Sequence, residues 1–216
     1  MSLQLKVRNI VLAGAFNSLA LDKYFFIKSD ILQESELVPN SFFSDGTVTQ
    51  VVTKIFQILI TPVQIIITSI NPLEDDKIED TVIKIIKGGS ILQLNALGFN
   101  FTWNFNDEEK NIHELSKKHF YNDEVKILKS HFNKPDSKFG IYASTNFEDS
   151  RLKLDIKPTS TTRISMTGAE IFEDIQFQFN FHIDMPKESK PIEALKYLKD
   201  YEKYKKLSLE IIDNYK

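Results

Sequence analysis

The 216-residue sequence contains no cysteine, which excludes disulfide bonds, thiol nucleophiles, iron–sulfur clusters and cysteine-ligated zinc. Glycine and proline are scarce, with seven residues of each, so there is little material for a phosphate-binding glycine loop. The chain also lacks the GxSxG, P-loop and GxGxxG motifs. These absences favour a non-catalytic protein and indicate no cofactor.

Positive charge is not concentrated in any segment, and the formal net charge is −3. Binding to nucleic acid depends on clustered lysine and arginine, because counterion release drives it, and anionic membranes attract the same kind of cluster. No stretch reaches the roughly 20 continuous apolar residues of a membrane-spanning helix. We therefore expect neither a nucleic-acid partner nor a membrane.

The N-terminus superficially resembles a signal peptide, because Lys6 and Arg8 precede an apolar run over residues 10–16. The run is at the short limit for such a segment, and Asn17 ends it. We interpret it as an opening β-strand and predict a cytoplasmic protein.

Phenylalanine is abundant, at 17 residues, and much of it lies in alternating patterns typical of strands. Residues 176–184 place one row of apolar side chains opposite one row of polar side chains. The apolar row is Phe177, Phe179, Phe181 and Ile183; the polar row is Gln176, Gln178, Asn180, His182 and Asp184. A second such strand ends the segment 91–105, with Phe99, Phe101 and Trp103 preceding Phe177, Phe179 and Phe181 by 78 positions. This spacing could reflect a duplication or chance.

The first third of the chain is also predicted to form strands. Residues 3–32 predict a strand, a break at Gly14 and Asn17-Ser18, and a second strand, and residues 33–47 predict a surface loop. The apolar segment 51–70 predicts two strands separated at Pro62, or one strand with an edge or bulge at this proline. This segment is apolar on both faces, which is typical of strands covered on both sides.

Helices are indicated in four places. Asn71 and Gly88 bracket a helix with acidic residues in its first turns, and Asn106 with Glu109 has the spacing of a capping box. Residues 121–134 are compatible with a short helix, residues 139–184 return to β-structure, and a helix of about 40 Å runs from about residue 190 to the end. The fold class is α+β: mostly antiparallel β-sheet with a few helices and a long C-terminal amphipathic helix. We expect one domain over 1–216, with a weak subdivision into 1–105 and 136–216 around 106–135.

Histidine is the residue to inspect for acid–base or metal chemistry. His113 and His119 belong to a near match to the zinc motif HExxH, but they are six residues apart, about 120° around a helix, and cannot chelate one ion. His182 and Asp184 share a strand face and are the candidate catalytic pair. A solvated sheet face would contain the same residues, and two side chains form no closed metal shell. We predict no metal site.

The C-terminal helix has a face rich in tyrosine, a residue favoured at interfaces. Its candidate interface residues are Tyr197, Tyr201, Tyr204, Ile211 and Tyr215. The helix could pack on its own sheet, or it could bind a protein partner or form a homodimer.

Two functions remain. The preferred one is a non-catalytic protein-interaction or assembly module. The alternative is a small-ligand-binding protein or unusual enzyme that uses the polar strand face around His182 and Asp184.

Overall fold

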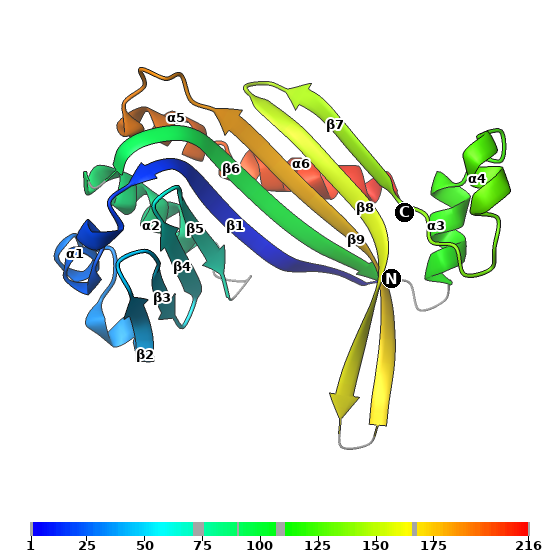
Figure 1. Ribbon diagram of the computed structural model, residues 1–216, viewed down its shortest axis with the longest axis horizontal. Coiled ribbons are helices and arrows are strands. Elements are labelled where there is room, and N and C mark those ends of the chain that lie inside the picture. The colour runs from blue at the N-terminus through cyan, green and yellow to red at the C-terminus, as the bar shows by residue number, and fades with distance from the viewer. Residues whose placement is uncertain (1, 71–75, 90, 107–110, 166–167, 216) are drawn as a thin grey trace.

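The computed structural model describes residues 2–70, 76–89, 91–106, 111–165 and 168–215. Within them, nine strands form one antiparallel sheet in the order β2-β3-β4-β5-β1-β6-β9-β8-β7 (Figure 1). The strands are β1 (Ser2–Phe16), β2 (Leu37–Ser44), β3 (Thr49–Thr53), β4 (Phe56–Thr61), β5 (Gln64–Ser69), β6 (Ile91–Asn106), β7 (Ile141–Phe147), β8 (Ser150–Ser165) and β9 (Gly168–Asp184). The α-helices are α1 (Lys23–Lys28), α2 (Asp76–Lys87), α3 (Ile112–Phe120), α4 (Lys126–His131), α5 (Leu195–Leu198) and α6 (Tyr201–Asp213), with short 3-10 turns at Ser18–Ala20, Glu34–Glu36 and Pro191–Ala194. The predicted α+β class is confirmed.

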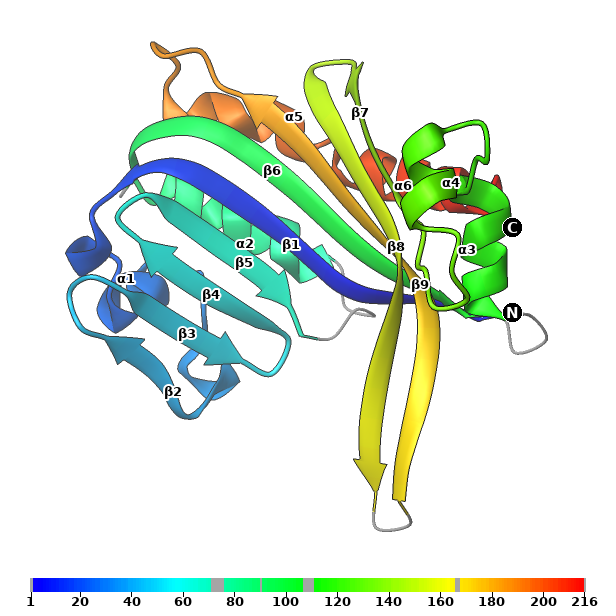
Figure 2. The ribbon, with the colours of Figure 1, turned by 45° about the vertical axis from the view of Figure 1, so that its right-hand side comes forward.

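One face of the sheet is covered by helices. Helix α2 packs against β1 and β5, and α6 packs against β6 and β9 (Figure 2). The helices cover this face because apolar and polar side chains alternate along the strands. The apolar side chains all point to one face of the sheet, and the helices bury them there.

The strand register joins these apolar side chains into one row across the sheet. The row takes one buried residue from each of seven neighbouring strands: Val51, Ile58, Ile67, Ile10, Phe99, Phe181 and Leu152. A slip of one residue in any of these strands would exchange its apolar and polar faces. The row therefore fixes the register of the whole sheet.

A β-bulge near Lys6 sets the direction of the side chains in β1, because the register with β6 shifts between Leu5 and Val7. Arg8 is in phase with the buried Ile10 and Leu12, so it lies on the helix-covered face, and it is only 1% exposed. Its Nη2 atom lies 3.4 Å from Ser69 Oγ. The sequence pattern did not reveal that this arginine is buried.

Of the two predicted break positions, Asn17-Ser18 follows the end of β1 at Phe16, whereas the strand continues through Gly14. The register with β6 shifts next to Gly14, and a Cβ atom at this position would lie 2.0 Å from the carbonyl oxygen of Gln93. Glycine is required there because the two backbones approach closely at the irregularity.

Several predicted elements in the first third differ from the structure. The expected second strand contains helix α1, whose N-terminus is capped because Asp22 Oδ1 accepts a hydrogen bond from Phe25 N at 2.7 Å. The expected loop over 33–47 contains strand β2. The segment 51–70 forms three strands, because the chain also turns at residues 54–55. These strands are buried on one face, and Val63 and Ile70 are exposed.

The helix boundaries also need correction. The predicted helix start at Asn71 and the predicted cap residue Glu109 lie outside the described residues. Asn106 belongs to β6, and α3 is capped by Asn111, whose Oδ1 accepts hydrogen bonds from the backbone of His113 and Glu114. The C-terminal helix is interrupted at residues 199–200, so α6 has 13 residues and a length of about 20 Å.

The order of the strands reveals a topological repeat. The chain from β1 to α2 runs strand, helix α1, a four-strand meander and helix α2; the chain from β6 to α6 runs strand, helices α3 and α4, a three-strand meander and helices α5 and α6. The opening strands β1 and β6 pair antiparallel at the centre of the sheet, and the subdivision around 106–135 stays a prediction. Strands β6 and β9, which carry the 78-residue offset, are neighbours in the sheet, and the suggested duplication stays a prediction. Their aromatic patterns match because the strands pair with each other and share the covered face, with Phe99 opposite Phe181.

The contact between α6 and the sheet is an aromatic cluster. Tyr201 lies against Phe99 and Phe101, with ring centroids 5.4 and 5.3 Å apart, and Tyr204 lies 4.7 Å from Phe181. Trp103 Nε1 donates a hydrogen bond to Ser208 Oγ at 3.0 Å, and Ser208 is completely buried. The helix is thus fixed to the sheet by ring packing and one buried polar contact.

We expect Ser208→Ala to lower the free energy of unfolding by about 1–2 kcal/mol, because it leaves the buried indole N–H of Trp103 without its acceptor. Urea unfolding followed by the fluorescence of Trp103, the single tryptophan, measures the effect. The exposed serine Ser35 provides the control Ser35→Ala, which should change the stability little. Equal stability of the two variants would contradict the role given to this contact.

Candidate functional site

His182 and Asp184 lie on the face of the sheet that the helices leave open. His182 Nε2 is 3.0 Å from Asp184 Oδ1, and the Asp184 side chain is 89% exposed. Exposed ion pairs of this kind contribute little to stability, because water solvates both partners. The structure brings the predicted pair together, but at an exposed position and outside the grooves described below.

A metal site would need at least one further ligand beside this pair. No group of three or more histidine, cysteine, aspartate or glutamate side chains within the described residues is arranged to bind a metal ion. His113 is engaged elsewhere, since its Nε2 atom lies 2.8 Å from Glu173 Oε1. His119 stacks on Tyr215, with ring centroids 4.4 Å apart.

The predicted tyrosine face is largely part of the protein core. Tyr201, Tyr204 and Tyr215 are buried, whereas Tyr197 and Ile211 are partly buried. The sequence left open whether this helix packs on its own sheet or binds a protein partner or a second copy. In the structure it packs on its own sheet. The three buried rings are therefore not exposed to a partner in this structure.

Burial changes the acid–base behaviour of these tyrosines. It raises the pKa of Tyr201 and of Tyr204 above the ordinary value, and it raises the pKa of Tyr215 to about 12. The hydroxyl groups of Tyr201 and Tyr215 have no hydrogen-bond partner within the described part of the chain. Ionisation of Tyr215 would place a charge in the core without a charged partner among the described residues, whereas the nearby Arg8 would offset part of the cost at Tyr201.

We therefore expect the stability to fall as the pH rises from about 10 towards 12. In the unfolded chain Tyr215 ionises near pH 10, whereas in the folded protein its pKa is about 12, so high pH favours the unfolded state. Tyr215→Phe should flatten this decline and leave the stability at neutral pH unchanged or slightly higher, because it removes an unsatisfied buried hydroxyl. Urea midpoints measured over this pH range test the expectation. An unchanged pH dependence in the variant would refute it.

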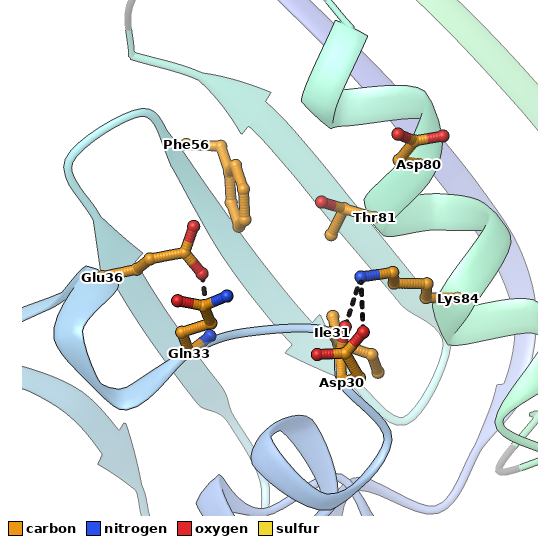
Figure 3. A pocket seen from close by; sticks show the side chains of 8 residues that line it. All are labelled: Asp30, Ile31, Gln33, Glu36, Phe56, Asp80, Thr81 and Lys84. Carbon is orange, nitrogen blue, oxygen red and sulfur yellow. Dashed lines mark hydrogen bonds and ion pairs between the residues drawn. The ribbon is translucent and has the colours of Figure 1, made fainter.

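A pocket of about 220 Å³ lies between α2 and the chain after α1 (Figure 3). Three carboxylates line it, but two have partners within the protein. Lys84 Nζ lies 3.3 Å from Asp30 Oδ2, and Glu36 Oε2 accepts a hydrogen bond from the backbone of Gln33 at 2.8 Å. The Lys84–Asp30 contact joins the loop to α2, the Glu36–Gln33 hydrogen bond lies within the loop, and we assign the pocket a structural role.

The most conspicuous surface feature is a two-stranded projection, here called the ribbon arm. It consists of residues 159–165 of β8 and 168–174 of β9, which continue beyond the other strands (Figures 1 and 2). Strand β6 pairs with β9 only as far as Ile175, and β7 pairs with β8 only as far as Ile156. Both edges of the arm are therefore open. Ile171 in the arm is 70% exposed.

The base of the ribbon arm is held by specific contacts. Asn106 Nδ2 donates a hydrogen bond to the carbonyl oxygen of Glu173 at 2.8 Å, and the Glu173 side chain pairs with His113 on α3. Lys138 Nζ lies 3.3 Å from Ser160 Oγ on the other strand. The arm is thus anchored at its base in a defined direction.

The two edge strands of the sheet differ in their protection. Strand β2 contains Pro39, and its register with β3 is irregular between Leu37 and Phe42. Strand β7, IYASTNF, contains neither proline nor a charged residue, pairs regularly with β8 and is mostly exposed. Proline, charge and irregularity are the usual means of preventing a foreign strand from pairing with an edge, and β7 has none of them. The sequence did not distinguish these edges, because strand order is not visible in it.

Comparisons with protein-family models, with curated proteins and with solved structures find no match. Within the described residues, no helix is both long and apolar enough to span a membrane. The function must therefore be inferred from the surface of the molecule itself.

Proposed function

We propose that the protein is a non-catalytic interaction or assembly module that engages a protein partner through the ribbon arm. The observation that carries this proposal is the absence of cover on the arm: none of the other strands pairs with residues 159–165 or 168–174 in the described part of the chain. A two-stranded hairpin alone is at best marginally stable in water. A binding partner would supply the missing cover.

The chemistry of the arm suits contact with another polypeptide. Its outer backbone groups can pair with an added strand, as sheet edges do in many peptide complexes. The side chain of Ile171 would be removed from water in such a complex, which favours association. The anchored base reduces the entropy that binding must otherwise overcome.

The unprotected edge of β7 would extend the contact that the ribbon arm makes with the partner. It lies at one end of the sheet, and its seven residues offer regular, uncharged pairing positions. The tyrosine face, by contrast, stabilises the module, and only the partly buried Tyr197 and Ile211 of the predicted interface residues retain exposed surface.

Removal of the arm tests the proposal. Thr159 and Asp174 lie directly opposite each other, so replacing residues 160–173 by Asn-Gly closes the hairpin with a tight turn and leaves the rest of the sheet intact. We expect this variant to fold with nearly unchanged thermal stability and to lose association. Light scattering over a micromolar concentration range measures self-association, and affinity purification with intact and shortened bait measures binding to other proteins.

A matched pair of point variants locates the contact. Ile171 on the arm and Val63 in the β4–β5 turn are comparably exposed, at 70% and 66%. Ile171→Ser should weaken association, and Val63→Ser should leave it unchanged. The proposal fails if the intact protein is strictly monomeric and recovers no protein that the shortened bait misses. Association that survives removal of the arm would also refute it.

A further inference from the structure

A groove of about 370 Å³ lies on the open face of the sheet, separate from the ribbon arm and from His182. Four adjacent strands contribute to it, in the order β6, β9, β8 and β7. The lining residues are Asn100, Thr102, Gln178, Phe179, Asn180, Lys153, Asp155 and Tyr142. With strands about 4.8 Å apart, the groove is about 14 Å across.

The register places these side chains in two parallel rows. Asn100, Asn180 and Lys153 are directly opposite one another in the first row. The second row, two residues along each strand, consists of Thr102, Gln178, Asp155 and Tyr142. All of these side chains point to the open side, because the intervening residues, such as Phe179 and Phe101, fill the core.

Hydrogen bonds within the face orient the amide groups. Asn180 Nδ2 donates to Asn100 Oδ1, and Asn100 Nδ2 donates to Asn9 Oδ1 at 2.7 Å. Gln178 Nε2 donates to Gln176 Oε1 at 2.6 Å. One N–H of each of these two amides is therefore used inside the protein, and the second N–H of each and the carbonyl oxygen of Asn180 remain for a ligand within the described residues.

The charges of the groove are nearly balanced. Asp155 is neutralised by Lys157, whose Nζ atom lies 2.7 Å from Asp155 Oδ2. Lys153 forms no ion pair within the described residues, so one ammonium group is available as a donor. A single cation beside a carboxylate is a poor match for phosphate or sulfate, which proteins bind with several arginines, lysines or backbone N–H groups.

The remaining groups are hydroxyls and one aromatic ring. Thr102 and Tyr142 can each donate and accept a hydrogen bond, Lys153 donates, and Asn180 and Asp155 accept. The Tyr142 side chain is 65% exposed and offers a flat apolar surface at the side of the groove formed by β7. This combination matches a ligand whose hydroxyl groups both donate and accept and whose ring also has an apolar C–H face.

We propose that this groove binds a neutral polyhydroxylated ligand, a carbohydrate, with the Tyr142 ring against the sugar and Lys153, Asp155 and Asn180 hydrogen-bonded to its hydroxyl groups. The proposal is independent of the ribbon arm. The ligand site predicted from the sequence lay at His182 and Asp184. The groove lies further along the polar row of β9, at Gln178 and Asn180, where four strands rather than one supply the polar groups.

Titration of the ¹⁵N-labelled protein with neutral malto-, cello- and chito-oligosaccharides at millimolar concentration tests the proposal by NMR. We expect at least one of these sugars to shift the backbone signals of Lys153, Gln178 and Asn180. Tyr142→Ala should weaken the binding about tenfold by removing the stacking surface, and Tyr142→Phe should retain most of it. His182→Ala, on the same face but outside the groove, is the matched control and should bind as the unmodified protein does.

Three results would overturn the proposal. The first is that none of these sugars shifts the groove signals. The second is that a sugar binds with the same affinity after Tyr142→Ala. The third is that inorganic phosphate, used as an anionic comparison, shifts the groove signals while the neutral sugars do not. Tyr142 is exposed, so loss of folding is not expected to obscure the comparison.

Discussion

The register of the nine-stranded sheet is the constraint on which the other features of the molecule depend. The apolar row from Val51 to Leu152 brings one buried side chain from each of seven strands into line. Because the side-chain period of a strand is two, the adjacent positions must form a polar row on the opposite face. That row runs through Gln57, Thr68, Asn9, Asn100, Asn180 and Lys153. The core and the open polar face are therefore two results of one alignment.

The central β1–β6 pair explains how the rest of the chain is arranged. Each of these long strands opens a half that returns through a meander, so the last strand of each half, β5 or β9, pairs with the strand that opened it. A helix then follows each half and covers its portion of the apolar face. The burial of Tyr201 and Tyr204 against phenylalanines of β6 and β9 follows directly from this order.

The same arrangement leaves particular surfaces without cover. Strands β8 and β9 are longer than their neighbours, so their ends leave the sheet as the ribbon arm. Strand β7 ends the sheet with an unprotected edge, while β2 ends it with a proline and an irregular register. The sites proposed for protein and ligand binding lie where the sheet has no helix or strand beside it.

The sequence by itself determined the elements with strong local patterns. The alternation of Phe99, Phe101, Trp103 and Phe105, and of Phe177, Phe179 and Phe181, correctly predicted two strands with one buried face. The sequence patterns predicted a strand where the structure has helix α1, which Asp22 caps. They also predicted one long C-terminal helix, which the structure interrupts before Tyr201. His182 and Asp184 were correctly placed on one strand face, but the sequence could not show that the neighbouring strands form a groove beside other residues.

Only the tertiary structure decided which strands are neighbours, and this decides what each face can do. Strand pairing joins residues far apart in the chain, such as Asn9, Asn100 and Asn180, and no local pattern records that contact. The burial of Arg8 depends on the cover of the sheet face that it shares with Ile10 and Leu12, and the exposure of the ribbon arm depends on where β6 and β7 end. The sequence determined the alternation of apolar and polar side chains, because that property is local. The positions of the groove, the edge and the arm were set by non-local pairing.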